Sequence, residues 1–78
     1  MVVLSKAPQH TQLKIIDFEG GHGVRRRLLS LGFHKNDIIQ LNKKNILGGP
    51  ILVTNLSSDT SVALGRGVAK KILVEIIE

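Results

Sequence analysis

The chain contains no cysteine, tryptophan or tyrosine, and Phe18 and Phe33 are the only aromatic residues among its 78. Without cysteine it can form neither disulfides nor thiolate metal sites, so burial of its abundant Ile, Leu and Val side chains must supply the core. The shortage of aromatic rings excludes an aromatic-lined groove for proline-rich peptides. It also argues against single-strand nucleic-acid binding, which depends on stacking.

Long apolar runs are missing as well. No segment approaches the roughly 20 apolar residues of a membrane span, and residues 1–8 lack the basic and apolar regions of a signal peptide. We therefore expect a cytoplasmic protein, not inserted into a membrane, that forms one domain over residues 1–78. Eleven Lys and Arg against six Asp and Glu give a net charge of +5, which favours acidic partners in general.

Five segments have the composition and alternation of short strands, and turn-forming residues separate them. They are residues 12–19, 38–43, 50–56, 60–64 and 72–77. In the first, Leu13 and Ile15 share one face and Ile16 and Phe18 share the other, which indicates a bulge or cover on both faces. Five short strands without room for parallel crossovers predict a mainly β fold, a small antiparallel barrel.

One inserted helix is expected at about residues 24–31, between the first and second strands. Val24, Leu28 and Leu31 recur at helical spacing and form its buried stripe. Gly32 is well placed to end the helix in the left-handed conformation, with an apolar contact from the residue that follows. Residues 68–71 would add one further helical turn.

Arg25, Arg26 and Arg27 follow a glycine-rich turn that lacks the Lys-Ser/Thr of a P-loop, so its glycines are better explained by a tight strand-to-helix connection. Consecutive helix residues point about 100° apart, so these arginines cannot all face one groove, and we expect no specific nucleic-acid partner. Arginine suits bidentate contacts with carboxylates of a partner protein. One or two of the three could instead pair locally with Asp17 or Glu19.

The three histidines, His10, His22 and His34, are scattered over expected loops, and the carboxylates form no obvious pair. No nucleophile with an adjacent base can be assembled, so we expect no enzyme. Imidazole and carboxylate groups suit ferrous iron, but no HxH or HxxxH spacing brings the histidines together. They are weak metal candidates: no cofactor should be required, and binding of Fe²⁺ or another divalent ion would be weak.

Residues 25–33 read RRRLLSLGF and resemble the RRRLLDLGF core of the FeoA family, small cytosolic components of bacterial and archaeal ferrous-iron uptake. Three further matches stand in register: EGG at residues 19–21, LGGPI at residues 47–51 and VALGR at residues 62–66. The chain departs from the family in a few places: HKND replaces the usual Pro-Gly turn after the helix, Ser30 stands where an acid is common, and Arg66 is a single arginine.

The resemblance implies an SH3-like barrel of five strands with the helix inserted after the first. It also implies an adaptor that binds the cytosolic part of FeoB, a membrane transporter with a G-protein domain, and modulates it. The alternative is a metal-sensing or iron-binding regulatory module, because iron-dependent repressors have the same fold as their C-terminal domain.

The predicted partner-binding residues are Arg25, Arg26, Arg27, Leu29 and Arg66. On charge alone, a solvated basic face is the simpler interpretation of the three helix arginines. The resemblance to the FeoA family favours the alternative, docking to a partner protein. Exposed apolar residues among Leu29, Leu47 and Ile77 would allow a homo-oligomer.

Overall fold

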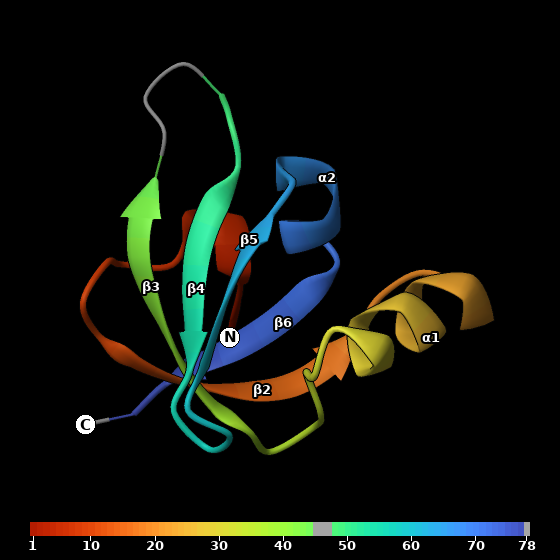
Figure 1. The fold of residues 1–78 in the computed structure, drawn as a ribbon, viewed down its shortest axis with the longest axis horizontal. Coiled ribbons are helices and arrows are strands. Elements are labelled where there is room, and N and C mark those ends of the chain that lie inside the picture. Colours follow the sequence, from red (N-terminus) through yellow and green to blue (C-terminus); the bar gives the residue numbers. More distant parts are fainter. Residues whose placement is uncertain (45–47, 78) are drawn as a thin grey trace.

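Six strands form a single antiparallel sheet in a computed structural model that describes residues 1–44 and 48–77 (Figure 1). The strands are β1 (Val2–Val3), β2 (Gln12–Phe18), β3 (Ile38–Lys44), β4 (Ile51–Asn55), β5 (Thr60–Leu64) and β6 (Ile72–Ile76). A 3-10 turn, η1 (Leu4–Lys6), and two helices, α1 (His22–Ser30) and α2 (Arg66–Ala69), complete the described elements. The spatial order of the strands is β1-β6-β2-β3-β4-β5.

All five expected strands are present, and the mainly β fold with one inserted helix is confirmed. Two details of the expectation were wrong. A sixth strand, β1, pairs with β6, and its two residues are too few to leave a periodic signal in the sequence. The sheet is also not closed into a barrel, because no pairing joins β5 to β1 within the described residues.

The side where the sheet stays open is covered by short helical segments. η1 follows the edge strand β1, α2 follows the edge strand β5, and the two segments contact each other. Leu4 of η1 and Ala69 of α2 are both fully buried, so these segments bury core surface that a closed barrel would cover with strand pairing. The helical turn expected at residues 68–71 is thus α2, two residues earlier.

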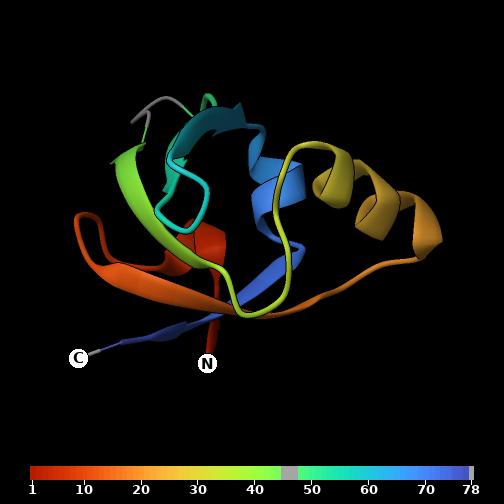
Figure 2. The ribbon, with the colours of Figure 1, turned by 60° about the horizontal axis from the view of Figure 1, so that its bottom comes forward.

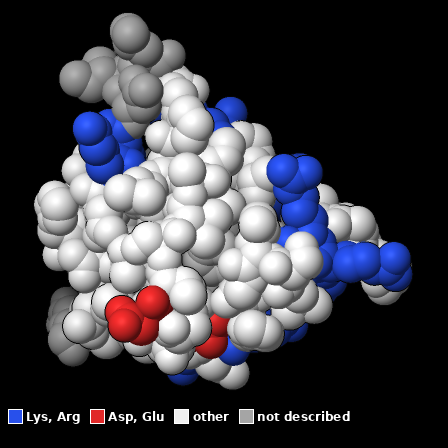
Figure 3. Space-filling model, in the orientation of Figure 1, with Lys and Arg blue, Asp and Glu red and all other residues white. Residues whose placement is uncertain are grey.

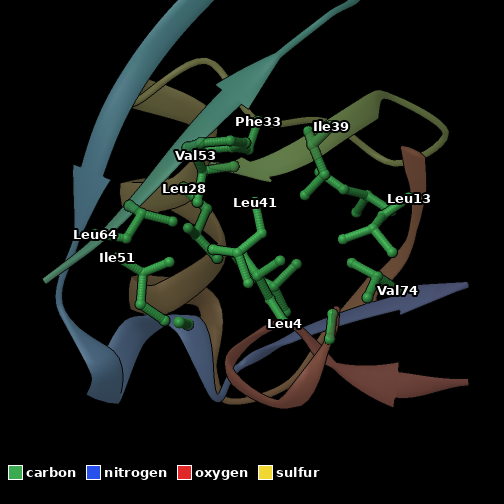
Figure 4. Packing of buried hydrophobic residues seen from close by; sticks show 14 of the residues in the cluster. Leu4, Leu13, Leu28, Phe33, Ile39, Leu41, Ile51, Val53, Leu64 and Val74 are labelled. Carbon is green, nitrogen blue, oxygen red and sulfur yellow. The ribbon is translucent and has the colours of Figure 1, made fainter. Parts of the chain in front are cut away.

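The core lies inside the curled sheet and consists almost entirely of aliphatic side chains (Figure 4). It contains Leu4, Ala7, Leu13, Ile15, Phe18, Leu28, Phe33, Ile39, Leu41, Ile51, Val53, Leu64, Ala69, Ile72 and Val74. The irregular pattern of β2 is explained by a bulge: its register against β6 shifts between Ile15 and Asp17. The extra residue lets Leu13, Ile15 and Phe18 all reach the core.

Helix α1 starts two residues earlier than expected and ends one residue earlier. The N–H of Gly32 donates to the carbonyl of Leu29, and the N–H of Phe33 donates to the carbonyl of Leu28, both at 3.0 Å. With Gly32 at φ +94°, these two bonds form a Schellman motif, and the buried rings and methyls of Phe33 and Leu28 supply its apolar contact. The expected left-handed stop is therefore confirmed.

At the other end of α1, the connection from β2 depends on Gly20. Its φ of +97° is left-handed, and a Cβ added there would lie 2.9 Å from Cγ2 of Val24. The Glu-Gly-Gly segment thus permits a sharp turn that brings Val24 over the core. As a result α1 projects from one side of the sheet and is attached to it at both ends (Figure 2).

Candidate functional site

The outward face of α1 is the most exposed part of the predicted site. Val24 and Leu28 point toward the core, whereas His22, Arg26 and Leu29, at positions i, i+4 and i+7, form the opposite stripe. All three outward residues are exposed, and Leu29 keeps 48% of its surface accessible. A large apolar side chain beside a cationic one, on a short helix, is an arrangement suited to contact with a protein.

Arg26 and the neighbouring Arg27 are exposed, and neither forms an ion pair within the part of the chain that the structure describes. Lysine and arginine side chains gather over the α1 end of the molecule, whereas the acidic side chains visible in the same view lie away from it (Figure 3). Arg26 and Arg27 therefore carry positive charge that no ion pair among the described residues neutralises.

Arg25 has a different environment from its two neighbours. Its Nη2 lies 3.2 Å from Oδ1 of Asp17 at the end of β2, and both side chains are about two-fifths exposed. The expectation that one of the arginines would pair locally with Asp17 is confirmed. Arg25 thus contributes to the attachment of α1 rather than to its outward face.

Asp17 also receives contacts from the segment that leaves α1. Nζ of Lys35 lies 3.3 Å from the same Oδ1, and the main-chain N–H of Phe18 donates to it at 2.8 Å. The Phe18 N–H and Lys35, together with Arg25, hold the pKa of Asp17 below its usual value. One carboxylate at the end of β2 therefore contacts both the first turn of α1, through Arg25, and the segment after α1, through Lys35.

A second attachment point is Asn55, the one buried polar residue in the described core, which is 1% exposed. Its Nδ2 donates to the carbonyl of Gly32 and to Oδ2 of Asp37, both at 2.9 Å, while its Oδ1 accepts the N–H of Ser57. Asn55 therefore connects the end of α1, the loop that follows it, and the β4–β5 turn.

Sequence reasoning missed Asn55, although a signal was present. Ile51, Val53 and Asn55 alternate along β4, which places the asparagine on the buried face of the strand. A polar residue at an inward position needs hydrogen-bond partners nearby. The same network lowers the pKa of Asp37: burial acts to raise it, but hydrogen bonds from Asn55 and from the N–H of His34 outweigh that effect.

Arg66 stands apart from the α1 arginines, at the first position of α2. It is partly buried, and its Nε donates to the carbonyl of Gly49 at 3.4 Å. The structure does not bring Arg66 into the outward stripe of α1. Of the apolar residues considered for an oligomer, Leu29 is exposed and Ile77 is partly buried, while Leu47 lies outside the described residues.

The three histidines are separate. His10 precedes β2 with a φ of +58°, His22 begins α1, and Nδ1 of His34 lies 3.2 Å from Oδ2 of Asp37. Over residues 1–44 and 48–77, no group of three or more His, Asp or Glu could hold a metal ion together. Within the same residues, no helix is long and apolar enough to cross a membrane.

Residues 2–76 match the family model of the FeoA domain. The chain belongs to the FeoA family. Its sequence is similar to a Methanocaldococcus jannaschii protein that bears the provisional name Fe(2+) transport protein A, at 28% identity over 78 residues, covering all of this chain and 90% of that protein. The FeoA family is thus one associated with Fe²⁺ transport.

Solved structures agree with this assignment. A crystal structure of an iron uptake regulatory protein, FeoA, superposes with a TM-score of 0.85 at 26% identity, covering 97% of this chain and 96% of that one. ScaR with bound Zn²⁺ superposes with a TM-score of 0.87 at 14% identity, covering 99% of this chain but only 37% of ScaR. The second likeness shows that the SH3-like fold of FeoA is shared with part of ScaR.

Proposed function

We propose that this FeoA-family protein is a cytosolic accessory protein of ferrous-iron uptake that binds the cytosolic part of a FeoB transporter and modulates it. The observation that carries the proposal is the outward face of α1, where Arg26, Arg27 and Leu29 are exposed and the arginines have no ionic partner among the described residues. The proposal requires no catalysis by this chain and no resident cofactor.

The chemistry of the face indicates what it would contact. Arginine binds carboxylates through two parallel hydrogen bonds, and Leu29 offers apolar area that becomes buried on association. An acidic surface with an apolar pocket is the complement. We propose Arg26, Arg27 and Leu29 as the primary contacts, with Arg25 and Arg66 acting mainly within the protein through Asp17 and Gly49.

Attachment of α1 at both ends supports a docking role for it. The Asp17 contacts hold the first turn and the exit loop, and Asn55 holds the residue after the helix. A helix fixed in this way loses little conformational entropy on binding, so more of the contact energy contributes to affinity. Modulation then requires only that the protein binds one state of the transporter more tightly than another.

The alternative function is a metal-sensing or iron-binding module, and the likeness of the fold to part of ScaR is the observation in its favour. That likeness is one of fold. Weak binding of Fe²⁺ at His10, His22 or His34 would support this alternative function and not the docking function.

An NMR titration of the labelled protein distinguishes the two functions. The cytosolic part of the transporter is added with and without a GTP analogue, and ferrous iron is added alone in a parallel series. Docking predicts shifts in residues 22–33, lost in Arg26→Glu and kept in Lys70→Glu, which reverses an exposed charge in the turn after α2. Shifts at the histidines with stoichiometric iron, and none with the transporter, would replace docking by the metal-binding function.

A further inference from the structure

Strand β5 is an edge strand without the features that usually protect one. Its sequence, Thr-Ser-Val-Ala-Leu, contains no charge, proline or glycine. It pairs with β4 at five consecutive positions without a bulge, and it makes no backbone hydrogen bond to described residues beyond that pairing. Natural sheets blunt such edges with charges, prolines or bulges, because the free N–H and C=O groups can pair with another chain.

The accessible part of this edge is its first four residues. Thr60, Ser61 and Ala63 are exposed and Val62 is partly buried, whereas Leu64 is buried. The other edge, β1, has only two residues, so β5 provides the longer template for an added strand. Among the described strands it is thus the better site for pairing with an external segment.

A shallow groove lies beside this edge, on the outer face of the sheet. Among the described residues, its lining consists of Lys43, Pro50, Leu52 and Ala63. Leu52 pairs with Ala63 on one side and with Lys43 on the other, so the groove crosses β3, β4 and β5. Leu52 is 39% exposed, although it is a leucine in the middle of a strand.

We propose that β5 accepts an extended polypeptide segment of a partner protein as an additional strand, and that the segment carries an apolar and an acidic side chain two residues apart, on the face that continues the groove. The free backbone edge selects an extended chain over a helix. The small side chain of Ala63 and the exposed Leu52 select an apolar residue in the groove, and Lys43, on a protein of net charge +5, selects an acidic one.

A second copy of this chain fits the same edge less well. Each copy carries +5, so two copies repel each other, and β5 has no acidic residue to place beside Lys43. The inference does not depend on docking through α1, because Arg26 and Leu29 lie on a different element from every residue that lines the groove.

The test uses the 78-residue protein and a synthetic peptide of about six residues, an average strand length, in which Val and Glu alternate along one face and Thr occupies the positions between them. We expect shifts in β4, β5 and Lys43, and slower hydrogen exchange of β5 amides. A peptide N-methylated at every residue, which has no backbone N–H to donate from either edge, should not slow that exchange. Ala63→Glu and Lys43→Glu should each weaken binding roughly ten-fold, while Lys6→Glu, an exposed charge reversal on η1, should not.

Other results would overturn the proposal. An absence of binding by the alternating peptide, or binding that N-methylation leaves unchanged, would exclude strand addition. A dimer in sedimentation that becomes monomeric in Ala63→Glu would show that the edge pairs with a second copy. By contrast, loss of binding to the transporter in Arg26→Glu, with peptide binding intact, would support the proposal, because it would separate this surface from the docking face of α1.

Discussion

The side-chain amide of Asn55 donates a 2.9 Å hydrogen bond to the main-chain carbonyl of Gly32, and so connects the end of β4 to the residue that terminates α1. These residues are far apart in sequence, and Asn55 itself is buried. A buried amide with all its partners in place fixes geometry more narrowly than apolar packing does, because a shifted helix would leave polar groups without partners.

Asn55→Ala should lower the free energy of unfolding by about 1–3 kcal/mol, since the carbonyl of Gly32, the Asp37 carboxylate and the N–H of Ser57 would each lose a partner. Urea denaturation measures the loss, and hydrogen exchange should show faster opening of α1. Asn42→Ala removes a partly exposed amide that bonds to Thr54 and is the control. Equal losses in the two variants would contradict the role given to Asn55.

Asp17 should make stability depend on pH at the acidic end. Its pKa is lowered in the folded protein, first by the N–H of Phe18 and then by Lys35 and Arg25. A carboxyl with a lowered folded pKa stabilises the protein above its unfolded pKa, and the contribution is lost as pH falls through the folded value. The loss should therefore occur below about pH 4.

Asp17→Asn removes the titrating group, so the variant should be less stable than the wild type at about pH 7, and the difference should shrink below about pH 4. Urea midpoints measured across this range test the prediction. Asp59→Asn, which changes an exposed acid with no ion pair among the described residues, is the control. A constant difference between wild type and Asp17→Asn at all pH values would show that the carboxylate charge is not responsible.

Two glycines of the α1 region should respond to alanine with opposite signs. Gly32 has a φ of +94°, so Gly32→Ala forces a Cβ into the left-handed region and should destabilise by about 1 kcal/mol. Gly23 lies inside α1 with nothing within 4 Å of an added Cβ, so Gly23→Ala should stabilise by about 0.5–1 kcal/mol. Thermal unfolding of both variants gives the signs, and a stabilising Gly32→Ala would contradict the Schellman assignment.

Whether the sequence alone predicts a feature of the fold depends on how far apart along the chain the interacting residues lie. Two patterns depend only on local spacing, and each predicted its element correctly. They are the helical stripe of Val24, Leu28 and Leu31 in α1 and the alternation of apolar residues in β4 and β6. The open sheet and strand β1 were missed because pairing between residues 2–3 and 73–74 leaves no local pattern. The bulge in β2 was suggested by the phase slip itself.

The candidate site divides in the same way. Exposure of Arg26, Arg27 and Leu29 follows from the helical period once the buried stripe is known. The position of Arg66 against the Gly49 carbonyl depends on tertiary structure, so its separation from α1 could not be foreseen. Asn55 combines both cases: its inward position is local, but its partners come from distant segments.

Adjacent leucines in α1 give the sharpest test of the division between core and docking face. Leu28 is fully buried, so Leu28→Ala should cost about 2–5 kcal/mol of stability by removing methyl groups and leaving a cavity. Leu29 is 48% exposed, so Leu29→Ala should change stability by no more than about 0.5 kcal/mol. Urea denaturation separates the two effects.

Transporter binding should respond to the two leucines in the opposite order, provided that the variants remain folded. Leu29→Ala removes apolar area that the transporter would bury, and calorimetry with its cytosolic part should show affinity reduced roughly five-fold, about 1 kcal/mol. Leu56→Ala, which shortens a leucine 42% exposed just after β4, is the matched control and should bind as the wild type does. If Leu29→Ala binds normally while Leu56→Ala does not, the contact surface lies at the end of β4 rather than on α1. That result would also move the search for the transporter's acidic complement away from Arg26 and Arg27.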